Sequence, residues 1–156
     1  MSIIQIAETL PTAALPDALQ TRLENAAIVA LVHTNTPGTS ELSIVITDDS
    51  QLQALSRQFL GIDSPTDVLS FPAEERDPDT GRAYLGDILI SLPRAQAQAE
   101  AAGHSLEAEL CLLTVHGILH LIGHDHAEEG QKAIMWSLQA QILEKLGVSP
   151  PLFPER

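Results

Sequence analysis

Residues 105–127 read SLEAELCLLTVHGILHLIGHDHA, and this stretch predicts a long helix that is capped by Ser105 and ends at Ile122. Serine is a preferred residue at a helix N-terminus, and Gly123 can adopt the left-handed conformation that often follows a last helical turn. Apolar side chains recur on one face of this helix, namely Leu112, Leu113, Val115, Leu119 and Ile122. That face predicts a central helix packed against a sheet.

Three histidines in the same stretch have the spacing of a metal site. His116 and His120 are four residues apart, so both point from one face of the helix, about 6 Å apart along its axis. A turn at Gly123 would bring His126 back toward them. Three neutral imidazoles suit Zn²⁺ and leave a fourth position for water. We therefore predict one Zn²⁺ per chain, bound by these three histidines, against the alternative of unrelated core, surface and turn histidines.

The residue after the first histidine argues against a peptidase. Zinc proteases with this histidine spacing carry a glutamate there as general base. Here the position is Gly117. A zinc protease with this sequence would therefore lack its usual proton acceptor.

Size and composition predict one domain over residues 1–156, with an irregular tail from about residue 148. A chain of 156 residues with 44% hydrophobic content can bury one ordinary core. The longest apolar run, Ala26–Val32, is too short to span a bilayer, and the N-terminus lacks the pattern of an export signal. We expect a soluble, cytoplasmic protein. The lone Cys111 lies in an apolar run, which indicates a buried structural thiol.

The formal charge of −13 opposes loose binding to nucleic acid, because the eight cationic residues are scattered along the chain. A phosphate-bearing substrate would need a local positive centre. Zn²⁺ held by three uncharged histidines would be such a centre.

The remaining pattern predicts an α+β fold, with a small mixed sheet of about four strands flanked by about five helices. Strands are expected at Ile3–Ile6, Glu41–Thr47, Val68–Phe71 and Tyr84–Ser91. Helices are expected at Asp17–Val32, Gln51–Phe59, Pro93–Ala102, residues 105–122 and about Glu128–Leu146. The polar stretch Pro72–Arg82 predicts a mobile hairpin loop.

Joined to residues 65–72 (PTDVLSFP) and 85–88 (LGDI), the histidine motif resembles the YbeY family of zinc-dependent endoribonucleases. The resemblance extends from about Asp49 to Leu146. It implies a single α+β domain, zinc ligands at the three motif histidines, and cleavage of single-stranded RNA. It further implies action in maturation of the 3′ end of small-subunit rRNA and in ribosome quality control. The implied partners are rRNA, the small ribosomal subunit and a ribosome-associated protein, with no membrane and no DNA.

One segment departs from the family pattern. Where the family usually reads aromatic-Arg-Gly-Lys-Asp, residues 59–63 read FLGID, so Leu60 and Ile62 replace two cations. Arg57 is a candidate substitute, although on a helix its side chain would point elsewhere, as a solvated surface residue does.

Five further polar residues are candidates near the metal. His124 could shuttle a proton or contact phosphate, or be an exposed turn histidine. Asp125 could orient a ligand ring or cap the last helix. Thr66 and Asp67 could orient a ligand or the water, or make only the backbone bonds of a turn. Asp87 could face the cleft or form a structural salt bridge.

Three functions remain open at this point. The first is a metal-dependent endoribonuclease that depends on a ribosome-bound partner for substrate delivery. The second is a zinc protease-like hydrolase, which the glycine at position 117 weakens. The third is a non-catalytic ribosome-assembly factor with structural zinc, which the acidic surface and the two missing cations favour.

Overall fold

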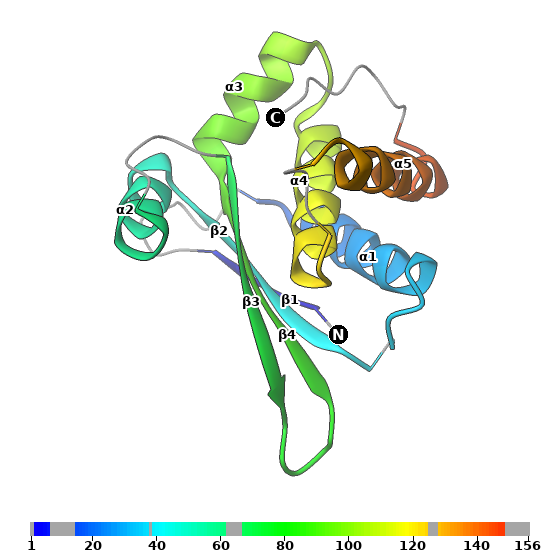
Figure 1. Cartoon of the computed structure of the whole chain (residues 1–156). Coiled ribbons are helices and arrows are strands. Elements are labelled where there is room, and N and C mark those ends of the chain that lie inside the picture. Colours follow the sequence, from blue (N-terminus) through cyan, green and yellow to red (C-terminus); the bar gives the residue numbers. More distant parts are fainter. Residues whose placement is uncertain (1, 7–14, 38, 62–66, 125–127, 149–156) are drawn as a thin grey trace.

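A computed structural model describes residues 2–6, 15–37, 39–61, 67–124 and 128–148 (Figure 1). Within these ranges, four strands form one mixed sheet and five helices flank it, which confirms the predicted α+β fold. The elements are β1 (Ser2–Ile6), α1 (Asp17–His33), β2 (Glu41–Thr47), α2 (Asp49–Leu60), β3 (Val68–Arg76), β4 (Ala83–Ser91), α3 (Leu92–Ala102), α4 (Leu106–Leu121) and α5 (Glu129–Lys145).

The strand order is β1-β2-β4-β3. The strands β1, β2 and β4 run parallel, and β3 pairs antiparallel with β4 at the edge. Ile44 of β2 and Ile88 of β4 are directly paired and fully buried. Because neighbouring residues of a strand face opposite sides, this pair defines the side of the sheet that carries the core.

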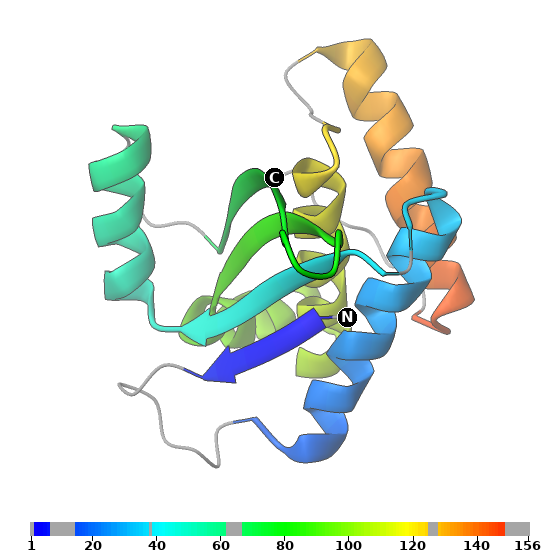
Figure 2. The same cartoon turned by 90° about the horizontal axis from the view of Figure 1, so that it is seen from below.

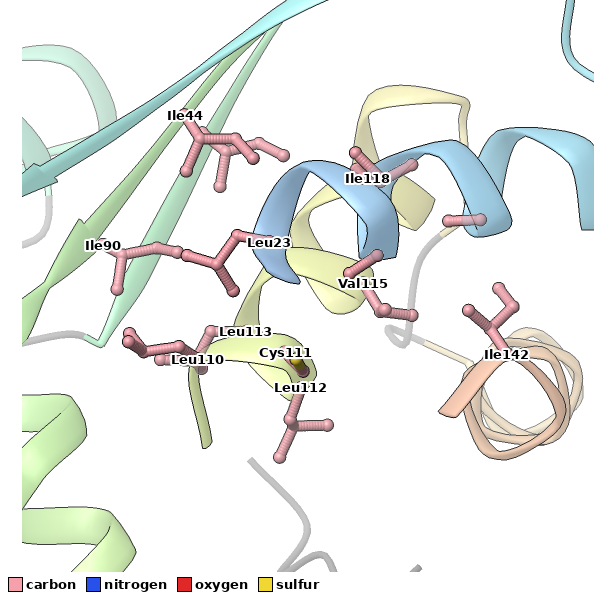
Figure 3. Packing of buried hydrophobic residues seen from close by; sticks show 14 of the residues in the cluster. Leu23, Ile44, Ile90, Leu110, Cys111, Leu112, Leu113, Val115, Ile118 and Ile142 are labelled. Atoms are coloured by element: carbon pink, nitrogen blue, oxygen red, sulfur yellow. The ribbon is translucent and has the colours of Figure 1, made fainter. Parts of the chain in front are cut away.

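The helices α1, α4 and α5 lie on that side of the sheet, whereas α2 lies on the other side (Figures 1 and 2). The helix α4 contacts β3 and β4 and is itself surrounded by α1, α3 and α5. Eleven of its sixteen residues are buried, far more than the single apolar face predicted. The central position of the predicted metal helix is therefore confirmed, and Figure 3 shows how its side chains fill the space between the sheet, α1 and α5.

Both ends of α4 follow the chemistry expected from the sequence. Ser105 Oγ accepts a hydrogen bond from the Ala108 N–H at 3.1 Å. At the other end, Gly123 has a φ of 103°, and the His124 N–H donates to the Leu119 carbonyl at 2.9 Å. This backward bond closes the helix in a Schellman motif and turns the chain at the predicted glycine.

The predicted hairpin loop is wrong in its first half, because Pro72–Arg76 continues β3. A proline is tolerated here since β3 is an edge strand, and a bulge interrupts its pairing between Pro72 and Glu75. The reversal is short: the Asp77 carbonyl accepts from the Gly81 N–H at 2.8 Å. The result is a long two-stranded hairpin that projects past the end of α4 (Figure 1).

None of the helices in the described ranges is both long and apolar enough to cross a membrane. The predicted burial of Cys111 is confirmed, since its side chain has no exposed surface.

Candidate metal centre

His116 and His120 of α4 present their Nε2 atoms to each other at 3.2 Å. Their ring centroids are 4.8 Å apart and the ring planes cross at 72°. Zinc–nitrogen bonds of 2.0–2.1 Å at a tetrahedral angle would separate two ligand nitrogens by about 3.3 Å. The distance also permits one ring to donate a hydrogen bond to the other. The pair therefore fits two adjacent vertices of a tetrahedral zinc site.

The ring of His116 is held by two residues of α5. Its Nδ1 atom lies 3.0 Å from Oε1 of Gln139, a side chain that is 3% exposed. Trp136 meets the ring edge to face, with centroids 5.8 Å apart. An amide oxygen can only accept, so the proton of this bond sits on Nδ1, and in the neutral ring the lone pair of Nε2 is directed at His120.

Gln139 was missed in the sequence, although a signal existed. Met135 and Ile142 of α5 are fully buried, and position 139 lies between them on the same helical face. A polar residue on an otherwise apolar face requires a hydrogen-bond partner.

Gly117 brings α4 close to the sheet. A Cβ atom built at this glycine would lie 2.7 Å from Cγ2 of Ile88, and the Ser70 hydroxyl donates to the Gly117 carbonyl at 3.2 Å. The position therefore faces β3 and β4, and the helix has no room there for the general base of a zinc protease.

A groove of about 770 Å³ opens beside His120. Its walls are the C-terminal end of α4, the loop at residues 35–37 and the hairpin of β3 and β4. Glu75 and Arg76 of the hairpin contribute one charge of each sign. A ligand that lay in this groove would reach the histidine pair from the side of His120.

Asp67 lies beside the opposite half of α4. In the orientation that satisfies its neighbours, the Gln98 amide nitrogen donates to Asp67 Oδ2 at 3.2 Å and to Glu109 Oε2 at 3.0 Å. Glu109 is fully buried and precedes His116 by two helical turns, about 10 Å. Its other carboxylate oxygen lies 2.7 Å from Nε2 of His104.

Asp87 is separated from the histidines by the sheet. Its neighbour Ile88 faces α4, so Asp87 faces the other side of the sheet. There it accepts a hydrogen bond from the Tyr84 hydroxyl. That hydroxyl also lies 2.9 Å from Ser43 Oγ. The structure thus gives Asp87 a tyrosine partner, where the sequence suggested a salt bridge or a cleft-facing carboxylate.

For two other predicted site residues the structure gives the position in the fold and the degree of burial. His124 is half-buried just beyond α4, and Arg57 is exposed on the last turn of α2, across the sheet from α4 (Figure 2). Three residues lie outside the described ranges, namely Thr66, Asp125 and His126. Within those ranges no three His, Cys, Asp or Glu side chains gather as a metal site. The described part of the predicted site therefore consists of two ligands.

Comparisons with known proteins agree with this architecture. The profile of the family described as Endoribonuclease YbeY matches residues 5–147. A protein of that name from Persephonella marina is 48% identical over 107 residues, 68% of this chain and 70% of the relative. Another from Heliobacterium modesticaldum is 40% identical over 145 residues, 86% of this chain and 87% of the relative.

A likeness in fold alone extends over the whole chain. The solution structure of TM1509 from Thermotoga maritima has a TM-score of 0.54, with 24% sequence identity. The match covers 99% of this chain and 97% of that one.

Proposed function

Because this chain is a member of the Endoribonuclease YbeY family, we propose that it is a zinc-dependent endoribonuclease that cleaves single-stranded RNA. Its substrate is rRNA, with action at the 3′ end of small-subunit rRNA and in ribosome quality control. The observation that carries the proposal is the pair of Nε2 atoms of His116 and His120, 3.2 Å apart at the end of an open groove.

The proposed ligands are His116, His120 and His126. Zinc, when bound, would supply Lewis acidity toward the phosphodiester. The chain's own groups would position the metal ligand and the substrate. Gln139 directs the Nε2 lone pair of His116 toward the metal position, and the groove guides an extended RNA strand to His120. His124, two residues before the third ligand, is the proposed proton-transfer group.

The charge of the chain bears on how RNA reaches the site. With a net charge of −13, the protein should bind bare RNA weakly at physiological salt. Within the groove, the cation Arg76 is offset by Glu75. We therefore propose that a ribosome-bound protein or the small subunit itself delivers the strand. Tight binding of the isolated protein to bare rRNA at physiological salt would contradict this part.

The proposal is tested by zinc content and RNA cleavage measured together. Purified wild type should carry one zinc per chain and cut an unpaired RNA, but not the same sequence in a duplex. His120→Ala should lose at least about 100-fold in rate together with its zinc, because a ligand is removed. His33→Ala is the matched control, since His33 bonds Gln141 at 2.8 Å on the surface and does not line the groove. Unchanged cleavage by His120→Ala or by chelated protein would reject the metal-centred mechanism.

The same preparation separates the other two functions. Cleavage of a casein-type substrate in place of RNA would indicate a protease-like hydrolase, which the contact between Gly117 and Ile88 disfavours. Co-sedimentation with ribosomal particles without any nuclease activity would indicate an assembly factor with structural zinc.

A further inference from the structure

We infer that Gln139 is a positioning residue of the metal centre, which sets the tautomer and the charge of the site through His116. The inference rests on the proposed function, because it concerns how this chain prepares a zinc ligand. It adds a residue from α5, a helix that contributes none of the predicted ligands.

The contact between Gln139 and His116 determines which nitrogen of the imidazole ring carries the proton. Gln139 Oε1 lies 3.0 Å from His116 Nδ1 and can only accept, so Nδ1 must be the protonated nitrogen. In the neutral ring the opposite nitrogen, Nε2, is then unprotonated, and it points at His120 Nε2, 3.2 Å away. Without the amide, a neutral imidazole could place its proton on either nitrogen, and one of the three proposed ligands would depend on that choice.

A second contact fixes the orientation of the same ring. Trp136 lies one helical turn before Gln139 and meets His116 edge to face, with ring planes crossing at 76°. The aromatic contact restricts rotation of the imidazole, and the hydrogen bond selects its tautomer. Together they hold the Nε2 atom of His116 in one orientation before a metal binds. A histidine on an exposed helix would have to become ordered in this way during binding.

The burial of Gln139 supports a role for its amide. The side chain is 3% exposed, and its helical neighbours Met135 and Ile142 are fully buried. An apolar residue would pack at this position without any desolvation cost. A buried amide is favourable only if it is hydrogen-bonded, and the ring of His116 meets that need.

The amide also determines the charge at the centre. A carboxylate could accept the same hydrogen bond, but it would add one negative charge next to the ligand ring and raise the basicity of the ligand. A neutral amide leaves the full +2 charge of a bound zinc ion to attract a phosphodiester. In a chain with a net charge of −13, this local positive charge matters for an anionic substrate.

The test compares zinc affinity, by competition with a chelator, across four full-length proteins. Gln139→Met keeps the length of the side chain, removes the acceptor, and should weaken zinc binding about 10-fold to 100-fold. Gln139→Glu restores the acceptor and should restore the affinity, while lowering the rate of RNA cleavage at saturating zinc. Gln141→Met is the matched control. Gln141 lies on the same helix as Gln139, but its side chain is at the surface, where it bonds His33 of α1. Its zinc affinity should equal that of wild type.

A second measurement does not depend on any variant of Gln139 folding. In metal-free wild type with a neutral His116 ring, nitrogen NMR should find the proton of that ring on Nδ1, with the signal assigned by its absence in His116→Ala. A proton on Nε2, or equal zinc affinity of Gln139→Met and wild type, would overturn the inference and leave the proposed function standing. A wild-type protein that binds no zinc would overturn both.

Discussion

The side chain of Ile88 fills the space into which a side chain at position 117 would project. A carbon placed on Gly117 would lie 2.7 Å from Cγ2 of Ile88 and within 3.2 Å of two further carbons of that residue. Ile88 is fully buried in the centre of the sheet, so it cannot move aside cheaply. The histidine that precedes this glycine and the glycine itself therefore face different surroundings: His116 faces its partner ligand, and Gly117 faces the sheet.

This contact predicts that Gly117→Ala destabilises the protein by about 1–3 kcal/mol, because overpacking a core outweighs the gain in helix propensity. Urea unfolding measures the change. Gly130→Ala is the matched control, since Gly130 also lies in a helix and nothing is within 4 Å of its built Cβ. That variant should be neutral or up to about 1 kcal/mol more stable. In an Ile88→Ala background the cost of Gly117→Ala should shrink, and an equal cost in both backgrounds would contradict the contact.

A buried thiol predicts how stability depends on alkaline pH. Burial raises the pKa of Cys111 from 9.0 to about 11, with Glu107 adding to the shift and Arg22 opposing it. The folded chain then holds this proton to higher pH than the unfolded chain does. The stabilisation is fully present below pH 9 and is lost as the pH rises toward about 11. Stability should fall less steeply across this window in Cys111→Ala than in wild type, and equal slopes in urea unfolding would contradict the prediction.

The buried carboxylate of Glu109 predicts a second stability effect, far from the histidine pair. His104 contacts one of its oxygens at 2.7 Å, and the Gln98 amide contacts the other. His104→Ala would leave a buried carboxylate with one fewer partner and should cost about 2–4 kcal/mol. Adding Glu109→Gln should recover part of this loss, because the buried negative charge is gone. Thermal unfolding measures both, and an additive double variant would contradict the pairing.

Local spacing accounts for what the sequence could predict about the site. Ser105 and Gly123 bound α4 through contacts within five residues, so helix and turn could both be read from the chain. His116 and His120 converge because they are four residues apart on that helix. The central position of α4 followed from its apolar content.

Contacts between distant segments account for what the sequence could not predict. Gln139 meets His116 across 23 residues, and no periodicity reports which polar side chain on a helix meets which partner. The extension of β3 through Pro72 depends on its edge position, which is a property of the assembled sheet. Asp67 stays a candidate for orienting a ligand or the water, and its bond to Gln98 of α3 likewise joins segments far apart in the sequence.

A bulge in β4 gives Asp87 its partner. Glu41 pairs with Tyr84 and the next residue of β2 pairs with Gly86, so one residue of β4 is left over, and Gly86 has a φ of 136°. In a regular strand, residues three apart face opposite sides of the sheet. The extra residue turns Tyr84 to the side of Asp87, where its hydroxyl donates to the carboxylate.

The partnership predicts two shifts of opposite sign in the pKa of Tyr84. Burial raises this pKa above 10.0, the bond to Asp87 raises it further, and the bond to Ser43 lowers it. Asp87→Asn should therefore lower the pKa, and Ser43→Ala should raise it. Tyr84 is the only tyrosine of the chain, so ultraviolet titration of the phenolate reports it directly. Because Asp87 lies across the sheet from the histidines, zinc affinity should stay unchanged in both variants. Loss of zinc in Asp87→Asn would instead connect this carboxylate to the metal centre.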